Sequence, residues 1–128
     1  MSQTWRVIVA LLGFVLLPGA AQAQVCPGVT GPVEAYAREA ITVSTTALPF
    51  TAGTYADGRG DVKFAQVTLE SNNIRVSVEG LVPSATVGEL WETSTNVKFV
   101  VCGQTSVRRF RAIRQGAADA TLTVTYFR

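Results

Sequence analysis

The side chains with the clearest capacity for chemistry lie near the C-terminus, where residues 107–114 read VRRFRAIR and include four arginines. A guanidinium group stays charged and binds carboxylate or phosphate oxygens through paired hydrogen bonds. If this segment is a β-strand, Phe110 lies on the core side and Arg109 and Arg111 lie on the opposite, solvent side. The sequence therefore predicts Arg109 and Arg111 as a candidate site for an anion or an acidic partner.

A structural use of the same two arginines is the favoured interpretation. An acid on a neighbouring strand, such as Glu70, would form cross-strand ion pairs with Arg109 and Arg111. Nucleic-acid readers usually present a broader basic face with exposed aromatic rings, so we expect no specific nucleic-acid partner. A polyanion or a glycan, such as the phosphate of lipopolysaccharide, remains the alternative ligand of the pair.

Catalytic residues are scarce in this chain. It contains no histidine, which excludes Ser-His-Asp and Cys-His nucleophile systems and histidine-based zinc sites. Glu79, Glu89 and Glu92 lie near one another in the sequence, and two acids suffice for glycoside hydrolysis, but solvated loop charges are the favoured interpretation. No phosphate-binding glycine motif is present. We therefore expect no enzyme activity, no cofactor and no metal.

The tripeptide Arg59-Gly60-Asp61 matches a known integrin ligand sequence. A flexible turn before a strand explains both glycines of the surrounding DGRGD segment, so the turn is favoured over adhesion. Asp57 and Asp61 are weak calcium ligands by themselves, because calcium takes about six to eight oxygens and the EF-hand pattern is missing.

Residues 1–23 have the features of a secretory signal peptide. Arg6 precedes the apolar run VIVALLGFVLLPGA, and Ala21-Gln22-Ala23 follows it. The run is shorter than the about 20 apolar residues of a membrane-spanning helix. We expect cleavage after Ala23, no membrane anchor afterwards, and a periplasmic or extracellular location.

The two cysteines of the chain, Cys26 and Cys102, are predicted to form a disulfide, because an exported chain with an even number of cysteines favours pairing. The bond would staple an irregular lead-in, residues 24–39, to a domain formed by residues 40–128. A redox or metal-binding pair is the disfavoured alternative.

The domain is predicted to be all-β. Alternating apolar and polar residues between turn residues indicate a single antiparallel β-sandwich, immunoglobulin-like or jelly-roll-like, of about six to eight strands. The candidate strands are residues 40–46, 61–71, 73–80, 96–102, 106–114 and 120–127. The lead-in includes a short helical turn at residues 33–39.

The side chains of several strands can be assigned to faces, because successive residues point to opposite sides of a sheet. The inward-facing set is Ala65, Val67 and Leu69, then Ile74, Val76 and Val78, then Ala120, Leu122, Val124 and Tyr126. The first and last strands are expected to be neighbours. Residues 96–102 are apolar on both faces, which predicts a strand covered on both sides, its outer side by the tail that Cys26 pins. Trp91 and Phe50 are expected in the core, with a sugar-stacking platform as the alternative.

Three segments between Ile41 and Arg128 carry a family-like pattern. The matching positions are Thr51, Ala52, Thr54 and Tyr55; Val67, Thr68, Glu70, Ile74 and Arg75; Phe110, Arg111, Ala112, Ile113 and Arg114; and Ala120, Thr121, Leu122, Val124, Thr125 and Tyr126. The pattern resembles small β-proteins of tailed phages and prophages that end in "FRAIR…ATLxVTY". This resemblance implies an antiparallel β domain that serves as an accessory or decoration component of a particle, without catalysis.

Tailed-phage particles assemble in the cytoplasm, whereas this chain carries an export signal. The expected function is therefore a non-catalytic exported structural or interaction module, phage- or prophage-related, with a protein or surface assembly as its partner. A carbohydrate- or envelope-binding module is the alternative.

Overall fold

The computed structural model describes residues 26–93 and 98–128. The predicted signal peptide lies outside these residues, and no described helix is long and apolar enough to cross a membrane. In chain order the described elements are β1 (Ala35–Val43), α1 (Ala52–Tyr55), β2 (Phe64–Ser71), β3 (Ile74–Ser77), β4 (Glu89–Trp91), β5 (Lys98–Cys102), α2 (Gln104–Arg109), β6 (Arg111–Arg114) and β7 (Ala120–Phe127).

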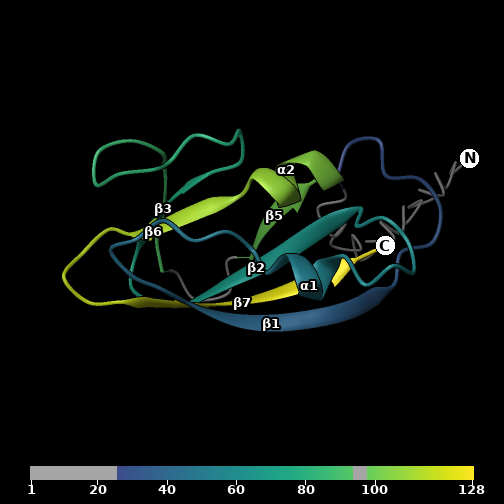
Figure 1. The fold of residues 1–128 in the computed structure, drawn as a ribbon, viewed down its shortest axis with the longest axis horizontal. Helices are drawn as coiled ribbons and strands as arrows, with labels where there is room; N and C mark the ends of the chain where they lie inside the picture. Colours follow the sequence, from purple (N-terminus) through teal and green to yellow (C-terminus); the bar gives the residue numbers. More distant parts are fainter. Residues whose placement is uncertain (1–25, 94–97) are drawn as a thin grey trace, which may run out of the picture.

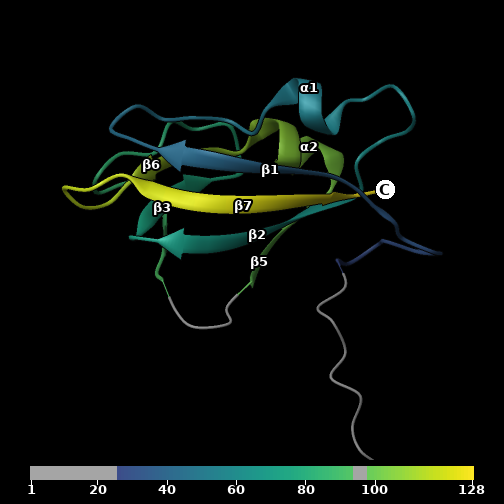
Figure 2. The same ribbon diagram turned by 90° about the horizontal axis from the view of Figure 1, so that it is seen from below.

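The strands form two antiparallel sheets that pack face to face (Figures 1 and 2). One sheet has four strands in the order β1-β7-β2-β5, and the other has three in the order β4-β3-β6. The predicted all-β sandwich is confirmed. Strand β1 pairs with β7 from Ala35↔Phe127 to Val43↔Ala120, so the first and last strands are neighbours, as expected.

Strands β2 and β7 are the centre of the larger sheet and follow the predicted alternation. Every second residue of β7 is buried, from Ala120 to Tyr126, while Thr121, Thr123 and Thr125 lie on the outer face. In β2 the same alternation buries Ala65, Val67 and Leu69. Because both strands pair on both sides, their backbone groups are satisfied and their inner faces supply the floor of the core.

Six aromatic rings form a continuous chain of contacts across the core. In order of contact they are Tyr55, Tyr126, Phe50, Phe110, Trp91 and Phe99. The rings of Phe50 and Phe110 stack with centroids 3.8 Å apart. Trp91 is only 4% exposed and Phe50 is buried, which confirms both as core aromatics. An exposed sugar-stacking platform at Trp91 is therefore wrong.

Two elements differ from expectation near the start and middle of the chain. Strand β1 begins at Ala35 instead of residue 40, and the predicted helical turn at residues 33–39 is wrong. The reason is tertiary, since the long β7 strand offers backbone partners to residues that lack strong strand propensity. Strand β4 was not predicted, because three residues are too short to show a period.

The predicted strand at residues 106–114 is wrong in its first half. The segment forms helix α2 followed by the short strand β6. Val107 and Phe110 are three residues apart and both are buried, so this spacing, which suits one face of a helical turn, anchors the helix against the core. Ala112 of β6 then continues the buried face.

The disulfide between Cys26 and Cys102 is present and closes a sequence separation of 76 residues. Residues 27–30 of the tail share a hollow with Cys102 and Gln104, so the tail covers the end of β5. Among the described strands, β5 is otherwise an edge. The sequence predicted that the tail covers the outer side of this strand, but the tail contacts only the end of β5 at Cys102.

One acidic side chain points inward from β1. Glu39 lies opposite Val124, and its Oε1 accepts hydrogen bonds from the Tyr126 hydroxyl and from the Thr51 backbone N–H, the latter at 3.1 Å. Burial, and then this hydrogen bond to Glu39, raise the pKa of the Tyr126 phenol far above its ordinary value of 10.0. The pair ties β1 and β7 to the segment before α1.

Removal of the disulfide should destabilise the domain. We expect the Cys26→Ser/Cys102→Ser variant to lose about 2–4 kcal/mol of unfolding free energy, because the unfolded chain gains the freedom of a long open loop. Urea unfolding followed by circular dichroism measures the change, and reduced wild-type protein is the control. An unchanged urea midpoint would contradict a stapling role.

Tyr126 should make the domain less stable at alkaline pH. The native state keeps the phenolic proton above pH 10.0, where the unfolded chain releases it. The unfolded state then binds fewer protons, so stability falls by about 1.4 kcal/mol per pH unit for this one group. Tyr126→Phe should show a shallower fall in urea midpoint above pH 10.0. Tyr36→Phe is the control, with a smaller effect because its phenol is half-buried; equal slopes for wild type and Tyr126→Phe would refute this role.

Candidate partner-binding surface

The structure separates the two arginines that the sequence placed on one strand face. Arg109 ends helix α2 and is exposed, whereas Arg111 begins β6 and is half-buried. They do not form the predicted outward pair of a single strand. The intervening Phe110 is buried in the core, so the chain turns between them.

Arg111 is held in place by the end of the helix. Its Nη1 donates to the backbone oxygen of Phe110 at 2.7 Å and, at a longer 3.4 Å, to that of Arg108. Carbonyl groups at the C-terminal end of a helix lack backbone partners, and a cation there is stabilising. The geometry gives Arg111 a structural use.

The predicted ion pairs with Glu70 are wrong. Glu70 lies in β2 of the four-stranded sheet, whereas Arg111 lies in the other sheet. The described part of the chain contains two ion pairs, Arg114–Asp119 and Arg128–Asp57, and neither includes Arg109. The guanidinium of Arg109 is therefore exposed without an ionic partner among the described residues.

Arg109 instead contacts the loop that joins β3 to β4. A β-carbon placed on Gly80 would lie 3.6 Å from Cδ of Arg109, so the arginine stem runs along the backbone of this glycine. Figure 1 shows the β3–β4 loop standing out from the sandwich on the side of β3, β6 and α2. We call residues 79–90 together with Arg109 the loop surface.

The β3–β4 loop is held by several internal contacts. The backbone N–H of Ser84 donates to the Val87 carbonyl at 2.9 Å, and the N–H of Val87 donates to the Ser84 hydroxyl at 3.1 Å. Pro83 is buried. From β3, Arg75 donates to the Gly88 carbonyl at 2.9 Å. These contacts hold the loop from Pro83 to Gly88.

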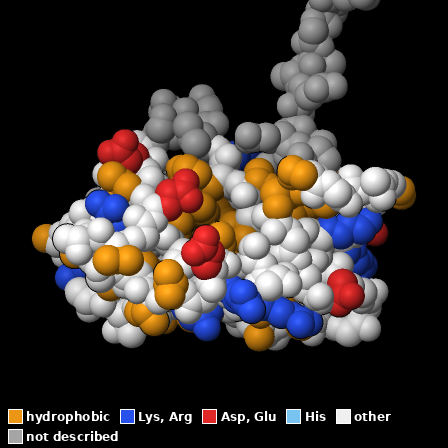
Figure 3. All heavy atoms as spheres, turned by 90° about the horizontal axis from the view of Figure 1, so that it is seen from above, with side chains coloured by type: hydrophobic (Ala, Val, Ile, Leu, Met, Phe, Trp, Pro, Cys, Tyr) orange, Lys and Arg blue, Asp and Glu red, His pale blue; other side chains and the backbone are white. Residues whose placement is uncertain are grey.

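Apolar side chains are concentrated at this fixed loop. Leu81 is 62% exposed and Val82 is 70% exposed. Among the described residues, five large hydrophobic side chains are exposed, and all but Val33 lie in the loop surface. Figure 3, which views this side of the molecule, shows hydrophobic and acidic side chains gathered together. Full burial of an exposed valine or leucine side chain contributes about 1.5–3 kcal/mol. A partner would therefore gain most binding free energy from the apolar side chains of this loop.

A hollow of about 200 Å³ lies beneath the loop, and its lining includes Glu79 and Glu89. Both glutamates are exposed. The general acid of a glycosidase is a carboxyl group in an apolar site that excludes most water. The exposed carboxyl groups of Glu79 and Glu89 do not lie in such a site. Glu92, the third acid of the sequence hypothesis, does not line this hollow.

The Arg-Gly-Asp loop lies elsewhere, between α1 and β2. Residues 56–61 are exposed. The Asp57 carboxylate accepts the Arg59 backbone N–H at 2.9 Å, and Asp61 accepts a hydrogen bond from Gln104. These contacts are those of a turn anchored to α2. Across residues 26–93 and 98–128, no group of three His, Cys, Asp or Glu residues gathers to hold a metal.

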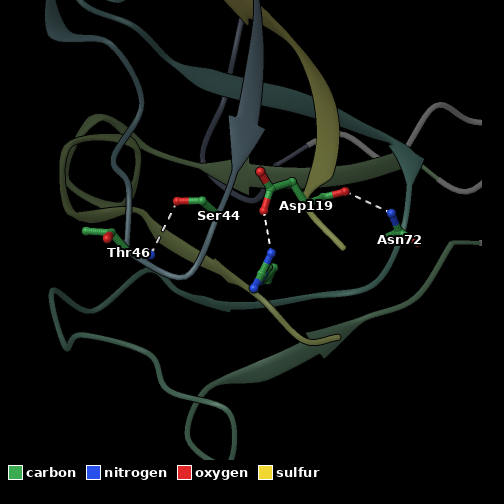
Figure 4. A network of polar contacts seen from close by, with 5 residues as sticks. Ser44, Thr46, Asn72 and Asp119 are labelled. Atoms are coloured by element: carbon green, nitrogen blue, oxygen red, sulfur yellow. Dashed lines mark hydrogen bonds and ion pairs between the residues drawn. The ribbon is translucent and has the colours of Figure 1, made fainter. Parts of the chain in front are cut away.

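Arg114 forms an ion pair with Asp119 at the end of β6 that lies away from the β3–β4 loop. Its Nη1 donates to Asp119 at 2.6 Å, and the Asp119 carbonyl accepts Asn72 Nδ2 at 2.8 Å (Figure 4). The backbone N–H of Arg114 donates to Ser44. This network joins the turns of both sheets, so Arg114 is a structural residue.

The fold and the loop surface together define, for the described residues, a small β-sandwich domain that presents an exposed apolar loop. Comparison with protein-family models, with curated proteins and with solved structures found no match to this chain. The resemblance to phage proteins is therefore untested by these comparisons and stays a prediction.

Sequence reasoning did not single out this surface, although two signals for it were present. Leu81 and Val82 are adjacent apolar residues between the turn residues Gly80 and Pro83. Because turns lie at the surface, an apolar pair inside a turn is a candidate binding site for a partner. The spacing of Val107 and Phe110 indicated the helix that places Arg109 beside the loop.

Gly88 should be required for the loop conformation. Its φ is +110°, and a β-carbon there would lie 2.8 Å from the Val76 carbonyl oxygen. We expect Gly88→Ala to cost about 1–3 kcal/mol of unfolding free energy, because the backbone must move to relieve the clash. Chemical denaturation measures the loss.

Gly116→Ala is the matched control for this substitution. A β-carbon at Gly116 meets no atom within 4 Å, so its effect should stay within about 0.5 kcal/mol. Equal stabilities of the two variants would show that the loop does not depend on Gly88.

Proposed function

We propose that this chain is a non-catalytic, exported interaction module, an accessory or decoration-type component that docks on a surface or particle through the loop surface. The observation that carries the proposal is the exposure of Leu81 and Val82 on a loop that is held by hydrogen bonds between Ser84 and Val87. A fixed loop loses little conformational entropy on binding, so more of the apolar burial remains as affinity.

The loop surface carries one cation, Arg109, and two exposed carboxylates, Glu79 and Glu89. A partner with an acidic group opposite Arg109 and a basic group opposite Glu89 would complement it. Arg109 has no ionic partner in the described chain, and its stem lies along Gly80 next to the exposed loop tip. Arginine beside exposed aliphatic residues is typical of protein interfaces, where it binds carboxylates at the rim of an apolar contact.

The proposed context is phage- or prophage-related. It rests on the segment resemblance, whereas the proposed export rests on the signal-like residues 1–23. An export signal and a disulfide suit a module that acts in the periplasm or outside the cell, where thiols are oxidised.

Substitution of the loop tip should detach the protein from its assembly. We expect Leu81→Ser/Val82→Ser to reduce co-fractionation with membrane, cell-surface or particle fractions by roughly tenfold, because central apolar contacts dominate interface energetics. The variant should unfold at the same urea concentration as wild type, since both side chains are exposed. Fractionation of cells and medium with quantitative immunodetection measures the shift.

Val33→Ser is the matched control, because Val33 is also exposed but lies outside the loop surface. It should fractionate like wild type. Recovery of the wild-type protein only as a free monomer, or unchanged fractionation of the loop-tip variant, would refute the proposed function.

A further inference from the structure

An apolar groove runs along the open side of the sandwich next to the loop surface. The hollow beneath the β3–β4 loop adjoins a second hollow of about 310 Å³, and the two share Val78 and Glu89. The second hollow is lined by Trp91 of β4 and Phe99 of β5, whose rings stack with centroids 4.2 Å apart. We call the two hollows together the edge groove.

The groove lies between the edge strands of the two sheets. Strand β4 is the edge of the three-stranded sheet, and β5 is the edge of the four-stranded sheet. Four consecutive β5 residues, from Phe99 to Cys102, line the second hollow. Since their side chains alternate between faces, the hollow follows the strand's backbone and not one of its faces. An edge strand presents backbone N–H and C=O groups that can pair with another strand.

The charge of the groove restricts its occupant. The charged residues that line it are Glu79 and Glu89, both carboxylates and both exposed. Lys98 begins β5 but does not line the hollow. The remaining lining is mostly apolar, and Phe99 and Val100 are only half-buried. A strand with alternate apolar side chains and a lysine or arginine would complement both properties.

We propose that the edge groove binds an extended segment of a partner protein, which adds as a strand to the free edge of β5. Alternate apolar side chains of the segment pack against Phe99 and Val78, and a basic side chain lies opposite Glu89. Main-chain hydrogen bonds to β5 supply affinity, and the pockets supply specificity. This inference deepens the proposed function and rests on it, because it names the chemistry of the docking partner.

A displayed library of random linear peptides, panned on the full exported protein, tests the proposal. Enriched peptides should alternate apolar residues and contain lysine or arginine. Synthetic copies should slow amide hydrogen exchange of β5 residues Phe99 to Cys102, because new main-chain bonds protect them. Proline substitution in the middle of a peptide should abolish this protection, since proline removes a donor.

Two variants place the binding in the groove. Ser106→Trp fills the second hollow, which Ser106 lines, and Thr105→Trp puts the same side chain on a neighbouring exposed position that does not line it. Ser106→Trp and Glu89→Lys should each weaken peptide binding by roughly tenfold, whereas Thr105→Trp should not. Glu89 is exposed, so its variant remains a valid test if Ser106→Trp fails to fold.

Several outcomes would overturn the proposal. They are the absence of any enriched peptide, binding that neither Ser106→Trp nor Glu89→Lys weakens, or peptides that bind without protecting β5 amides. Vesicles of phosphatidylcholine and phosphatidylglycerol test a lipid occupant, and binding to them that Ser106→Trp abolishes would assign the groove to a membrane instead. Self-association of the free protein that the same variant abolishes would assign the groove to a second copy.

The failures of the two proposals are distinguishable. If the native protein fractionates with no assembly but peptides still bind the groove, the surface or particle role fails alone. If the protein fractionates with an assembly through Leu81 and Val82 but no peptide binds, the edge groove proposal fails alone.

Discussion

The packing of the Phe110 ring is the contact on which the rest of the sandwich depends. Phe110 stacks on Phe50 and contacts Trp91, so one side chain joins the segment after β1, the edge strand β4 and the junction between α2 and β6. Aromatic side chains bury large areas, and stacked pairs contribute beyond that area. Because the ring occupies the core, the chain must turn on either side of it. That turn separates Arg109, which faces solvent beside the β3–β4 loop, from Arg111, which caps the helix.

The features that suit the chain for binding follow from how this small core is closed. Two sheets packed face to face leave edges wherever no further strand pairs, and here the edges of both sheets, β4 and β5, line one groove. The disulfide covers only the Cys102 end of β5. Meanwhile the neighbouring loop is held from Pro83 to Gly88 by the Ser84 turn and by the close approach of Gly88 to Val76. The apolar loop tip, the groove and Arg109 thus lie on one side of the molecule, whereas the network of Arg114 and Asp119 closes the far end.

The central strands β2 and β7 were predicted most closely, and the edge strand β5 was also predicted, whereas the edge strand β4 and the start of β1 were not. β2 and β7 have sheet neighbours on both sides, and their alternation in the sequence matches the buried pattern residue by residue. β4 is too short to show a period, and β1 begins earlier than its composition suggests because β7 supplies a pairing partner. Phe110 and Ala112 fit one face of a strand, which would put Val107 on the other face, whereas a helical turn puts Val107 and Phe110 on one face. The segment from Val107 to Phe110 is therefore compatible with either element. Only its packing against the rest of the core selects the helix.

The amino-acid sequence by itself determined the all-β class, the inward faces of the central strands, the burial of Phe50 and Trp91, and the pairing of Cys26 with Cys102. These properties depend on local alternation, on side-chain size and on there being two cysteines to pair. The tertiary structure alone decided that Arg109 lies in helix α2 and Arg111 in strand β6, and that Glu70 and Arg111 lie in different sheets. It also decided that β4 and β5 form the two sides of a groove. Each of these is a relation between residues distant in sequence. The relative positions of such residues depend on which surfaces pack against each other in the core, and a local sequence pattern does not specify that packing.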